Sequence, residues 1–229
     1  MMAKLIESSD LCPEVRNFTF EAEGQERFPF LPGQFVSFHE TLGGKRITRA
    51  YSIASPPDGN RFELCLNRVQ AGLFSPHLFA MQPGEMVEMT GPLGYFTLRN
   101  PDRNCVFIAT GTGIAPFRSM LHAHLAEKPA RQYTLIFGVR YETHIMYRGE
   151  FERLAARHAN FLFQPTVTRP EHSWTGRTGR VQQHLFEAIG DRQDIDVYVC
   201  GLKEMVDEVR VLLKGRGFDR KQIIFEKYD

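Results

Sequence analysis

From Cys105 onward, strand-like apolar runs alternate with longer helical patterns, and this alternation restricts the fold more than any other feature. Strands are expected at Cys105–Ala109, Tyr133–Gly138, Phe161–Thr166, Asp196–Cys200 and Gln222–Lys227, and helices at Pro116–Ala126, Arg148–Arg157, Val181–Ile189 and Lys203–Lys214. Right-handed crossovers join such units into a parallel sheet with helices on both faces. The second half is therefore predicted to be an α/β domain with a Rossmann-like parallel sheet.

The first half has a different texture, with short alternating runs separated by turn residues. Strands are expected at Val15–Phe20, Phe35–Phe38, Ile47–Ile53, Phe62–Val69, Met86–Met89 and Tyr95–Leu98, with one helix at Ser75–Met81. Short strands at regular spacing predict a small antiparallel β-barrel. The polar segment 99–104 separates the two sequence patterns, so we predict domains at residues 1–100 and 101–229.

Composition excludes several classes of protein. The 229 residues carry 28 Lys and Arg against 27 Asp and Glu, which gives no reason to expect nucleic acid as a partner. The N-terminal segment lacks the apolar core of a signal peptide, and no stretch approaches the roughly 20 apolar residues of a membrane span. We expect a cytoplasmic protein that does not contact a membrane.

The four cysteines are scattered singly, at Cys12, Cys65, Cys105 and Cys200. This spacing fits neither a disulfide framework nor a metal site, and it excludes a self-contained plant-type iron–sulfur cluster. We expect no metal.

Two motifs in the first half combine groups that suit a phosphorylated aromatic ligand. In Arg49-Ala-Tyr-Ser52, alternation along a strand places Arg49 and Tyr51 on one face and Ser52 on the other. In Gly72-Leu-Phe-Ser75, Ser75 is expected to cap a helix whose free N–H groups face a diphosphate. Taken separately, each motif also fits an ordinary strand or a capped turn that binds nothing.

The second half opens with the string Thr110-Gly-Thr-Gly-Ile-Ala-Pro-Phe-Arg-Ser119. Its pattern Gly111-x-Gly113-x-x-Pro116 follows an apolar strand and begins a helix, which is the context of a phosphate-binding turn. Proline replaces the usual third glycine, and proline is tolerated in the first turn of a helix because its missing N–H would have no partner there.

Arginines follow the strands at which a dinucleotide's ribose would be recognised. Arg140 ends the second strand of this half, where an NAD-type site would carry an acidic residue, and Arg169 and Arg180 lie in later loops. Guanidinium groups bind phosphate through paired hydrogen bonds, so we favour NADPH over NADH.

The order and spacing of these motifs, together with Cys200-Gly-Leu-Lys203 and the terminal Glu226-Lys-Tyr228-Asp229, resemble the ferredoxin:NADP+ reductase family of flavoproteins along nearly the whole chain. The resemblance implies that Arg49 pairs with the flavin phosphate, Tyr51 packs on the isoalloxazine ring and Ser52 lies near its N5 edge. It implies that Cys200 helps to position the nicotinamide without acting as a nucleophile. It also implies that Glu226 hydrogen-bonds toward the serine and that Tyr228 covers the flavin; the additional residue Asp229 departs from the family's pattern.

The resemblance assigns catalytic roles to Ser52, Cys200, Glu226 and Tyr228. Its cofactor-binding residues are Arg49, Ala50, Tyr51, Ser52, Gly72, Phe74, Ser75, Thr112, Gly113, Pro116, Arg140, Thr168, Arg169, Arg180 and Gly201. The diphosphate motif makes FAD the expected flavin rather than FMN.

The expected activity is hydride transfer between NADPH and FAD, with single electrons passed to or from ferredoxin or flavodoxin by a monomeric enzyme. Three alternatives remain open: a reductase component of an oxygenase system, an NAD(P)H:flavin reductase, and a regulatory or assembly subunit that keeps the fold without turnover.

Overall fold

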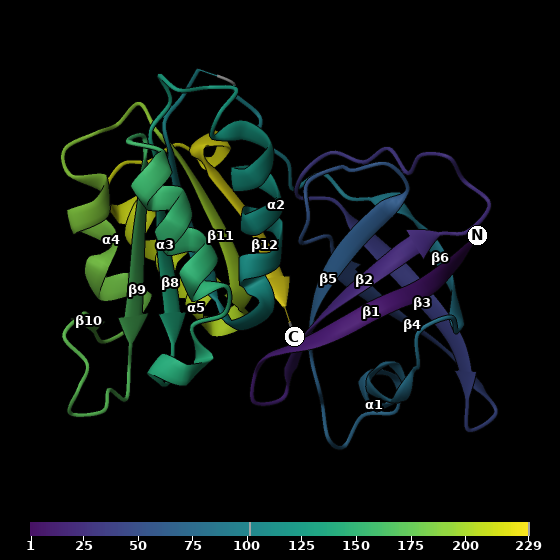
Figure 1. Ribbon diagram of the computed structural model, residues 1–229. Helices are drawn as coiled ribbons and strands as arrows, with labels where there is room; N and C mark the ends of the chain where they lie inside the picture. The colour runs from purple at the N-terminus through teal and green to yellow at the C-terminus, as the bar shows by residue number, and fades with distance from the viewer. Residues whose placement is uncertain (101, 229) are drawn as a thin grey trace. The chain divides into compact units, whose positions relative to one another are not determined.

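The computed structural model describes residues 1–100 and 102–228, and their contacts form two compact units (Figure 1). The first unit comprises Met1–Leu98 together with Ala115–Ala123. The second unit comprises Arg99–Ile114 and the chain from His124 onward. Most of helix α2 (Ala115–His124) thus groups with the first unit. The division at residues 1–100 and 101–229 stays a prediction.

The first unit is built on an antiparallel sheet of six strands in the order β4-β3-β6-β1-β2-β5. Its elements are β1 (Met2–Cys12), β2 (Val15–Ala22), β3 (Phe35–Leu42), β4 (Lys45–Ser52), β5 (Arg61–Asn67), α1 (Phe74–Ala80) and β6 (Met86–Leu93). A bridge between Ile53 and Leu64 brings the end of β4 to β5, so the two edge strands meet. The predicted antiparallel architecture is confirmed.

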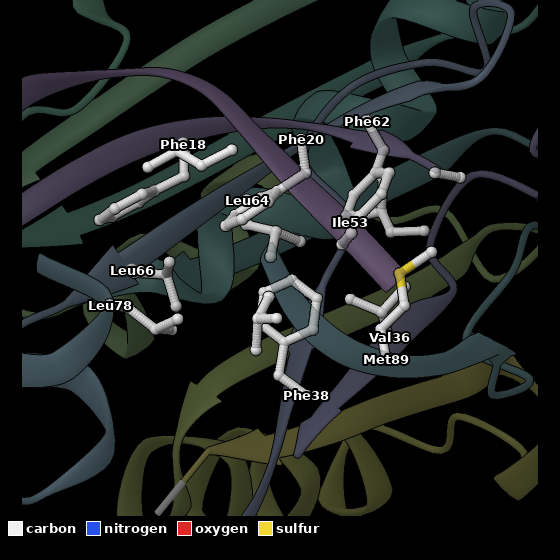
Figure 2. Packing of buried hydrophobic residues seen from close by; sticks show 14 of the residues in the cluster. Phe18, Phe20, Val36, Phe38, Ile53, Phe62, Leu64, Leu66, Leu78 and Met89 are labelled. Carbon is white, nitrogen blue, oxygen red and sulfur yellow. The ribbon is translucent and has the colours of Figure 1, made fainter. Parts of the chain in front are cut away.

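Aromatic and aliphatic side chains from all six strands fill the interior of this sheet. Phe20 lies at the centre, with its ring 5.0 Å from that of Phe38 and 5.9 Å from that of Phe62 (Figure 2). Leu78 of α1 is also fully buried in the cluster. This packed core gives β4 a rigid base.

The second unit contains a parallel sheet of six strands in the order β10-β9-β8-β7-β11-β12. Its strands are β7 (Cys105–Thr110), β8 (Tyr133–Val139), β9 (Phe161–Val167), β10 (Arg177–Thr178), β11 (Asp196–Leu202) and β12 (Ile223–Tyr228). The helices are α3 (Arg148–Arg157), α4 (Val181–Ile189) and α5 (Lys203–Gly215), with short 3-10 turns η1 (Gly111–Ile114), η2 (Glu142–His144) and η3 (Arg220–Gln222). The predicted α/β architecture is also confirmed.

Helices cover both faces of the parallel sheet. Leu185 of α4 and Val209 of α5 pack with Val106 of β7 on one face. On the other face, the ring of Phe151 in α3 lies 5.2 Å from that of Phe163 in β9. The carboxyl ends of the strands stay available for ligands, as is usual for open α/β sheets.

In the first half, one predicted strand was wrong and one strand was missed. Tyr95–Leu98 is not a strand, because Phe96 packs against Phe117 of α2, with ring centres 5.8 Å apart, instead of joining a ladder. Strand β1 was missed because only Ala3 and Leu5 carry its buried alternation before a polar run begins.

Candidate functional site

Strand β4 carries the first group of predicted site residues. Tyr51 pairs with Val36 and Arg49 with Phe38, so both side chains share one face of β4. Tyr51 packs against the core, whereas Arg49 is exposed. The ring of Tyr51 lies 5.8 Å from Phe38 and 6.3 Å from Phe74. Burial raises the pKa of Tyr51, while the nearby charge of Arg49 partly opposes this shift. The result is a fixed aromatic surface with an exposed guanidinium beside it, which suits a flavin ring and its phosphate.

Ser52 lies on the opposite face of β4, as the alternation predicts, and is buried. It pairs with Phe35 of β3, whereas its neighbour Ala50 is exposed. Arg49 donates from Nη1 to the carbonyl of Thr48 at 2.8 Å. The structure thus brings the Arg-Ala-Tyr-Ser segment together on one strand.

The predicted helix cap at Ser75 was wrong. Helix α1 begins at Phe74, its N-cap is Leu73, and no side chain caps it. The hydroxyl of Ser75 instead accepts a hydrogen bond from the backbone N–H of Val69 at 2.9 Å. Ser75 therefore closes the turn that contains Gly72, and Phe74 supports the ring of Tyr51.

The glycine turn after β7 is held by two close backbone approaches. A Cβ at Gly113 would lie 2.4 Å from the carbonyl oxygen of Cys200, and a Cβ at Gly201 would lie 2.3 Å from Oγ1 of Thr110. Thr110 also accepts a hydrogen bond from the N–H of Leu202 at 3.3 Å. Gly113 and Gly201 are thus required for packing the turn against the end of β11.

Gly111 has a different role in the same turn. Its φ of +55° favours glycine, and no described atom lies within 4 Å of the position that a Cβ would take. The turn continues through Thr112 as a 3-10 helix into α2, with Pro116 as the second residue of that helix. The open side of this backbone suits a phosphate group.

The arginine-bearing loops meet at the carboxyl ends of β8 and β9. The backbone N–H groups of Thr168 and Arg169 donate to the carbonyls of Val139 and Arg140, at 3.0 and 2.8 Å. Arg169 reaches the hydroxyl of Tyr141 at 3.4 Å. Sequence reasoning missed Tyr141, although an aromatic residue directly after Arg140 was a usable signal.

Arg180 is the N-cap residue of α4, on the neighbouring loop. Arg177, which precedes it, is bound to Glu187 through both guanidinium nitrogens and also approaches His184. Arg177 is therefore committed to a structural ion pair, whereas Arg140, Arg169 and Arg180 have no carboxylate partner among the ion pairs of the described residues.

Cys200, Glu226 and Tyr228 form a cluster at the edge of the parallel sheet. Cys200 is fully buried and pairs in register with Glu226 on the adjacent strand β12. Burial raises the pKa of the Cys200 thiol well above 9.0; the charge of Glu226 raises it further, and a hydrogen bond with the Tyr228 side chain partly lowers it. The thiol is neutral at physiological pH, which agrees with a positioning role. Asp229 lies outside the described residues.

Among the described residues, no group of three or more His, Cys, Asp and Glu side chains could hold a metal ion. Nor does any described helix have the length and apolar character that crossing a membrane requires.

Comparison with known proteins gives two domain families. Residues 2–98 match the FAD-binding domain of oxidoreductases, and residues 107–211 match the NAD-binding domain of oxidoreductases. Ferredoxin–NADP reductase B of Sorangium cellulosum is 41% identical over 99% of this chain and 97% of its own length.

Two further relatives are named for other electron-transfer systems. The toluate 1,2-dioxygenase electron transfer component of Pseudomonas putida is 30% identical over 87% of this chain, which spans 59% of that protein. The crystal structure of cytochrome P450 reductase GcoB from Amycolatopsis superposes with a TM-score of 0.89 at 30% identity, covering 99% of this chain and 68% of the other.

Proposed function

The chain belongs to the ferredoxin–NADP reductase family, with FAD-binding and NAD-binding oxidoreductase domains, and we propose that it transfers hydride between NADPH and FAD and exchanges single electrons with ferredoxin or flavodoxin. The observation that carries this proposal is the 41% identity to a ferredoxin–NADP reductase over 97% of that protein's length. The cofactors, when bound, supply the hydride and electron chemistry, and the protein supplies binding and orientation.

The flavin is assigned to strand β4 and the turn before α1. Arg49 binds its phosphate, Tyr51 supports its ring, and Ser52 and Ala50 line the ring edge. The Ser75 hydroxyl accepts from Val69, and the N–H of Gly72 donates to the carbonyl of Val69 at 2.8 Å. We therefore assign the diphosphate contact to the backbone N–H groups of Leu73–Ser75. Phe74 acts through Tyr51, against which it packs.

NADP(H) is assigned to the carboxyl ends of the parallel strands. The backbone of Thr112 and Gly113, at the start of a helix that contains Pro116, binds the diphosphate. Arg140, Thr168, Arg169 and Arg180 recognise the 2′-phosphate, because guanidinium groups form paired hydrogen bonds with phosphate. Gly201 keeps the end of β11 close to the turn.

The cluster of Cys200, Glu226 and Tyr228 is assigned to the nicotinamide. Cys200 provides a neutral, buried surface for the nicotinamide ring. The carboxylate of Glu226, beside Cys200, is the hydrogen-bond acceptor of the cluster. Tyr228 bonds to the thiol at the place assigned to the nicotinamide, so its side chain has to move when that ring binds.

The proposal is tested by anaerobic reduction. The purified protein should be yellow, release FAD on heating, and lose its colour when NADPH is added under argon. The reduced protein should then reduce ferredoxin or flavodoxin. Recovery of stoichiometric FMN would contradict the diphosphate assignment, and a colour unchanged by NADPH would contradict the activity and support a regulatory subunit.

A reductase component of an oxygenase system is the second candidate, because one relative is named as the electron transfer component of toluate 1,2-dioxygenase. Parallel assays with ferredoxin, flavodoxin and an oxygenase component distinguish the two. An NAD(P)H:flavin reductase would lose its flavin on gel filtration and reduce free FMN or FAD faster than any carrier.

Location and assembly are also part of the proposal. Four free cysteines suit a reducing compartment, and we propose that the enzyme works in the cytoplasm as a monomer. Size-exclusion chromatography with light scattering should give a mass near 26.3 kDa plus FAD.

A further inference from the structure

Arg118 and Ser119 end the glycine-rich string that begins at Thr110, and none of the cofactor assignments uses them. Both lie on α2, and both are buried. Arg118 donates from Nη1 to the carbonyl of Ala54 at 3.0 Å and to Oε2 of Glu63 at 2.8 Å. The hydroxyl of Ser119 donates to the carbonyl of Ser55 at 2.6 Å. All these contacts lie within the first unit.

Two of the three acceptors, Ala54 and Ser55, belong to the segment that directly follows the flavin strand β4, and the third, Glu63, lies on β5. Ala54 comes two residues after Ser52, and its N–H donates to the carbonyl of Glu63 at 2.7 Å. The N–H of Glu63 donates to Oγ of Ser55 at 3.0 Å, and its carboxylate accepts from Asn17 at 3.0 Å. Arg118 is therefore the cation of a hydrogen-bonded network that fixes the exit of β4.

The buried charge in this network needs its partner. The Arg118 side chain is 11% exposed and that of Glu63 28%, so water screens the ion pair only in part. Loss of one member of a mainly buried pair leaves the other charge uncompensated. The position of Arg118 therefore favours an arginine, because its guanidinium donates to the carbonyl of Ala54 and to the carboxylate of Glu63 at the same time.

Helix α2 also continues without interruption from the turn Gly111–Ile114. That turn carries Thr112 and Gly113, to whose backbone the dinucleotide diphosphate is assigned. The hydrogen bonds between α2 and the segment after β4 fix the N-terminal end of α2. Because the turn is covalently continuous with that end, they also fix the last residue of the turn.

We propose that Arg118, with Glu63 as its partner, is a positioning residue for hydride transfer that couples the exit of the flavin strand to the dinucleotide-binding turn. This inference rests on the proposed function. Hydride transfer is sensitive to small displacements of the reacting groups, and a shift of about 1 Å can lower a rate roughly a hundredfold. Arg118 touches neither cofactor in this assignment and acts through Ala54 and through α2.

The test compares Arg118→Met, Arg118→Lys and Glu63→Gln with the wild type in anaerobic stopped-flow reduction by NADPH. We expect Arg118→Met to lower the limiting rate of flavin reduction by roughly ten- to a hundredfold, with unchanged FAD content and less than about a threefold change in the Kd for NADPH. Arg118→Lys should recover part of the rate because it keeps the charge. Glu63→Gln removes the negative charge but keeps the shape of the side chain. Its limiting rate of flavin reduction should also fall, and it decides the test if Arg118→Met does not fold.

Arg16→Met is the matched control. Arg16 also joins a backbone carbonyl to a carboxylate, donating to Phe79 of α1 at 3.0 Å and to Asp10 of β1 at 2.6 Å, and neither partner belongs to the end of β4. It should lower thermal stability without changing the limiting rate. Equal limiting rates in wild type, Arg118→Met and Glu63→Gln would overturn the inference.

Hydrogen exchange gives a second readout that does not depend on turnover. Exchange should accelerate in peptides covering residues 52–55 and 110–117 in Arg118→Met, and in neither peptide in Arg16→Met. If only residues 52–55 respond, the coupling is absent and Arg118 stabilises the barrel alone. A wild type that NADPH does not reduce would contradict the proposed function, while the exchange result would still decide the coupling.

Discussion

At the scale of single residues, Cys200 and Arg169 have opposite surroundings. Cys200 is enclosed by β11 and β12, and both burial and Glu226 raise the pKa of its thiol. Arg169 follows the end of β9 and is exposed, with Tyr141 as its polar contact. A neutral buried thiol suits contact with a ring, and an exposed guanidinium suits recognition of a phosphate.

Cys200 should resist alkylation in the folded protein. The thiolate is the nucleophile in such reactions, and raising a thiol pKa lowers the thiolate fraction at a given pH. We expect activity to survive iodoacetamide at pH 8, while denatured protein takes up label at all four cysteines, as intact mass measurements would show. Rapid inactivation with one adduct on Cys200 would contradict the assigned role.

Replacing Arg169 by alanine should reduce selectivity for NADPH. Loss of one charge-assisted phosphate contact should cost about 1.5–3 kcal/mol of NADPH recognition and little for NADH. The measurement is kcat/KM with each cofactor, and Arg157→Ala, an exposed arginine at the end of α3, is the control. An equal loss with both cofactors would show that Arg169 does not read the 2′-phosphate.

At the scale of elements, strand β12 is held by side chains of α5 and by pairing with β11. Nζ of Lys227 lies 2.6 Å from Oδ1 of Asp207 on α5, and Arg210 covers the ring of Phe225 at 3.8 Å. Tyr228 bonds to Cys200 on the neighbouring strand. The strand is thus fixed up to Lys227, and displacement of Tyr228 requires only its own side chain to move.

Tyr228→Ser should tighten NADP+ and weaken discrimination against NADH. The oxidised nicotinamide would no longer have to displace an aromatic ring, a contact of order 1 kcal/mol beyond its buried area. Titration of NADP+ into both proteins, followed by the flavin difference spectrum, measures the change. Identical affinities and identical charge-transfer bands would show that the ring does not compete with the nicotinamide.

Hydrophobic periodicity predicted the elements of the second half well, and α3 and α4 have the predicted bounds. It failed where tertiary contacts decide the outcome. The sequence predicts Ser75 as a helix N-cap, but its hydroxyl instead accepts a hydrogen bond from the N–H of Val69. The roles of Gly113 and Gly201 in packing could not be predicted, because each depends on backbone that is about 90 residues away in the chain.

The same limit applies to the candidate site. Arg49, Tyr51 and Ser52 could be predicted together because one strand carries them. Arg118 could be seen in its motif, but its partners Ala54 and Glu63 belong to another part of the sequence, and no local pattern connects them.

At the scale of the whole molecule, buried cysteine thiols and tyrosine hydroxyls make the stability of the fold sensitive to high pH. Burial raises the pKa of Cys105 from 9.0 to about 12 and that of half-buried Cys12 to about 11, and it also raises the pKa of Tyr51 and Tyr198. The unfolded chain releases these protons at lower pH than the folded chain. Their contribution to stability is therefore complete below about pH 8 and is lost progressively between about pH 9 and 12.

The free energy of unfolding should accordingly fall steadily above pH 9. Urea titrations between pH 7 and 11 measure it. Cys105→Ala should start from a lower stability because it leaves a cavity, but its stability should decline less steeply because one buried acid is gone. A flat profile up to pH 11 in the wild type would contradict the raised values.

The grouping of Ala115–Ala123 with the barrel has a consequence for recombination. A chimera joined near residue 100 would give the barrel a foreign α2 and separate the carbonyls of Ala54 and Ser55 from their donors. The natural block for exchange between relatives is discontinuous in the gene, since Ala115–Ala123 must travel with residues 1–98. Swapped enzymes that respect this block should keep the native melting temperature of the barrel, and those cut once should not.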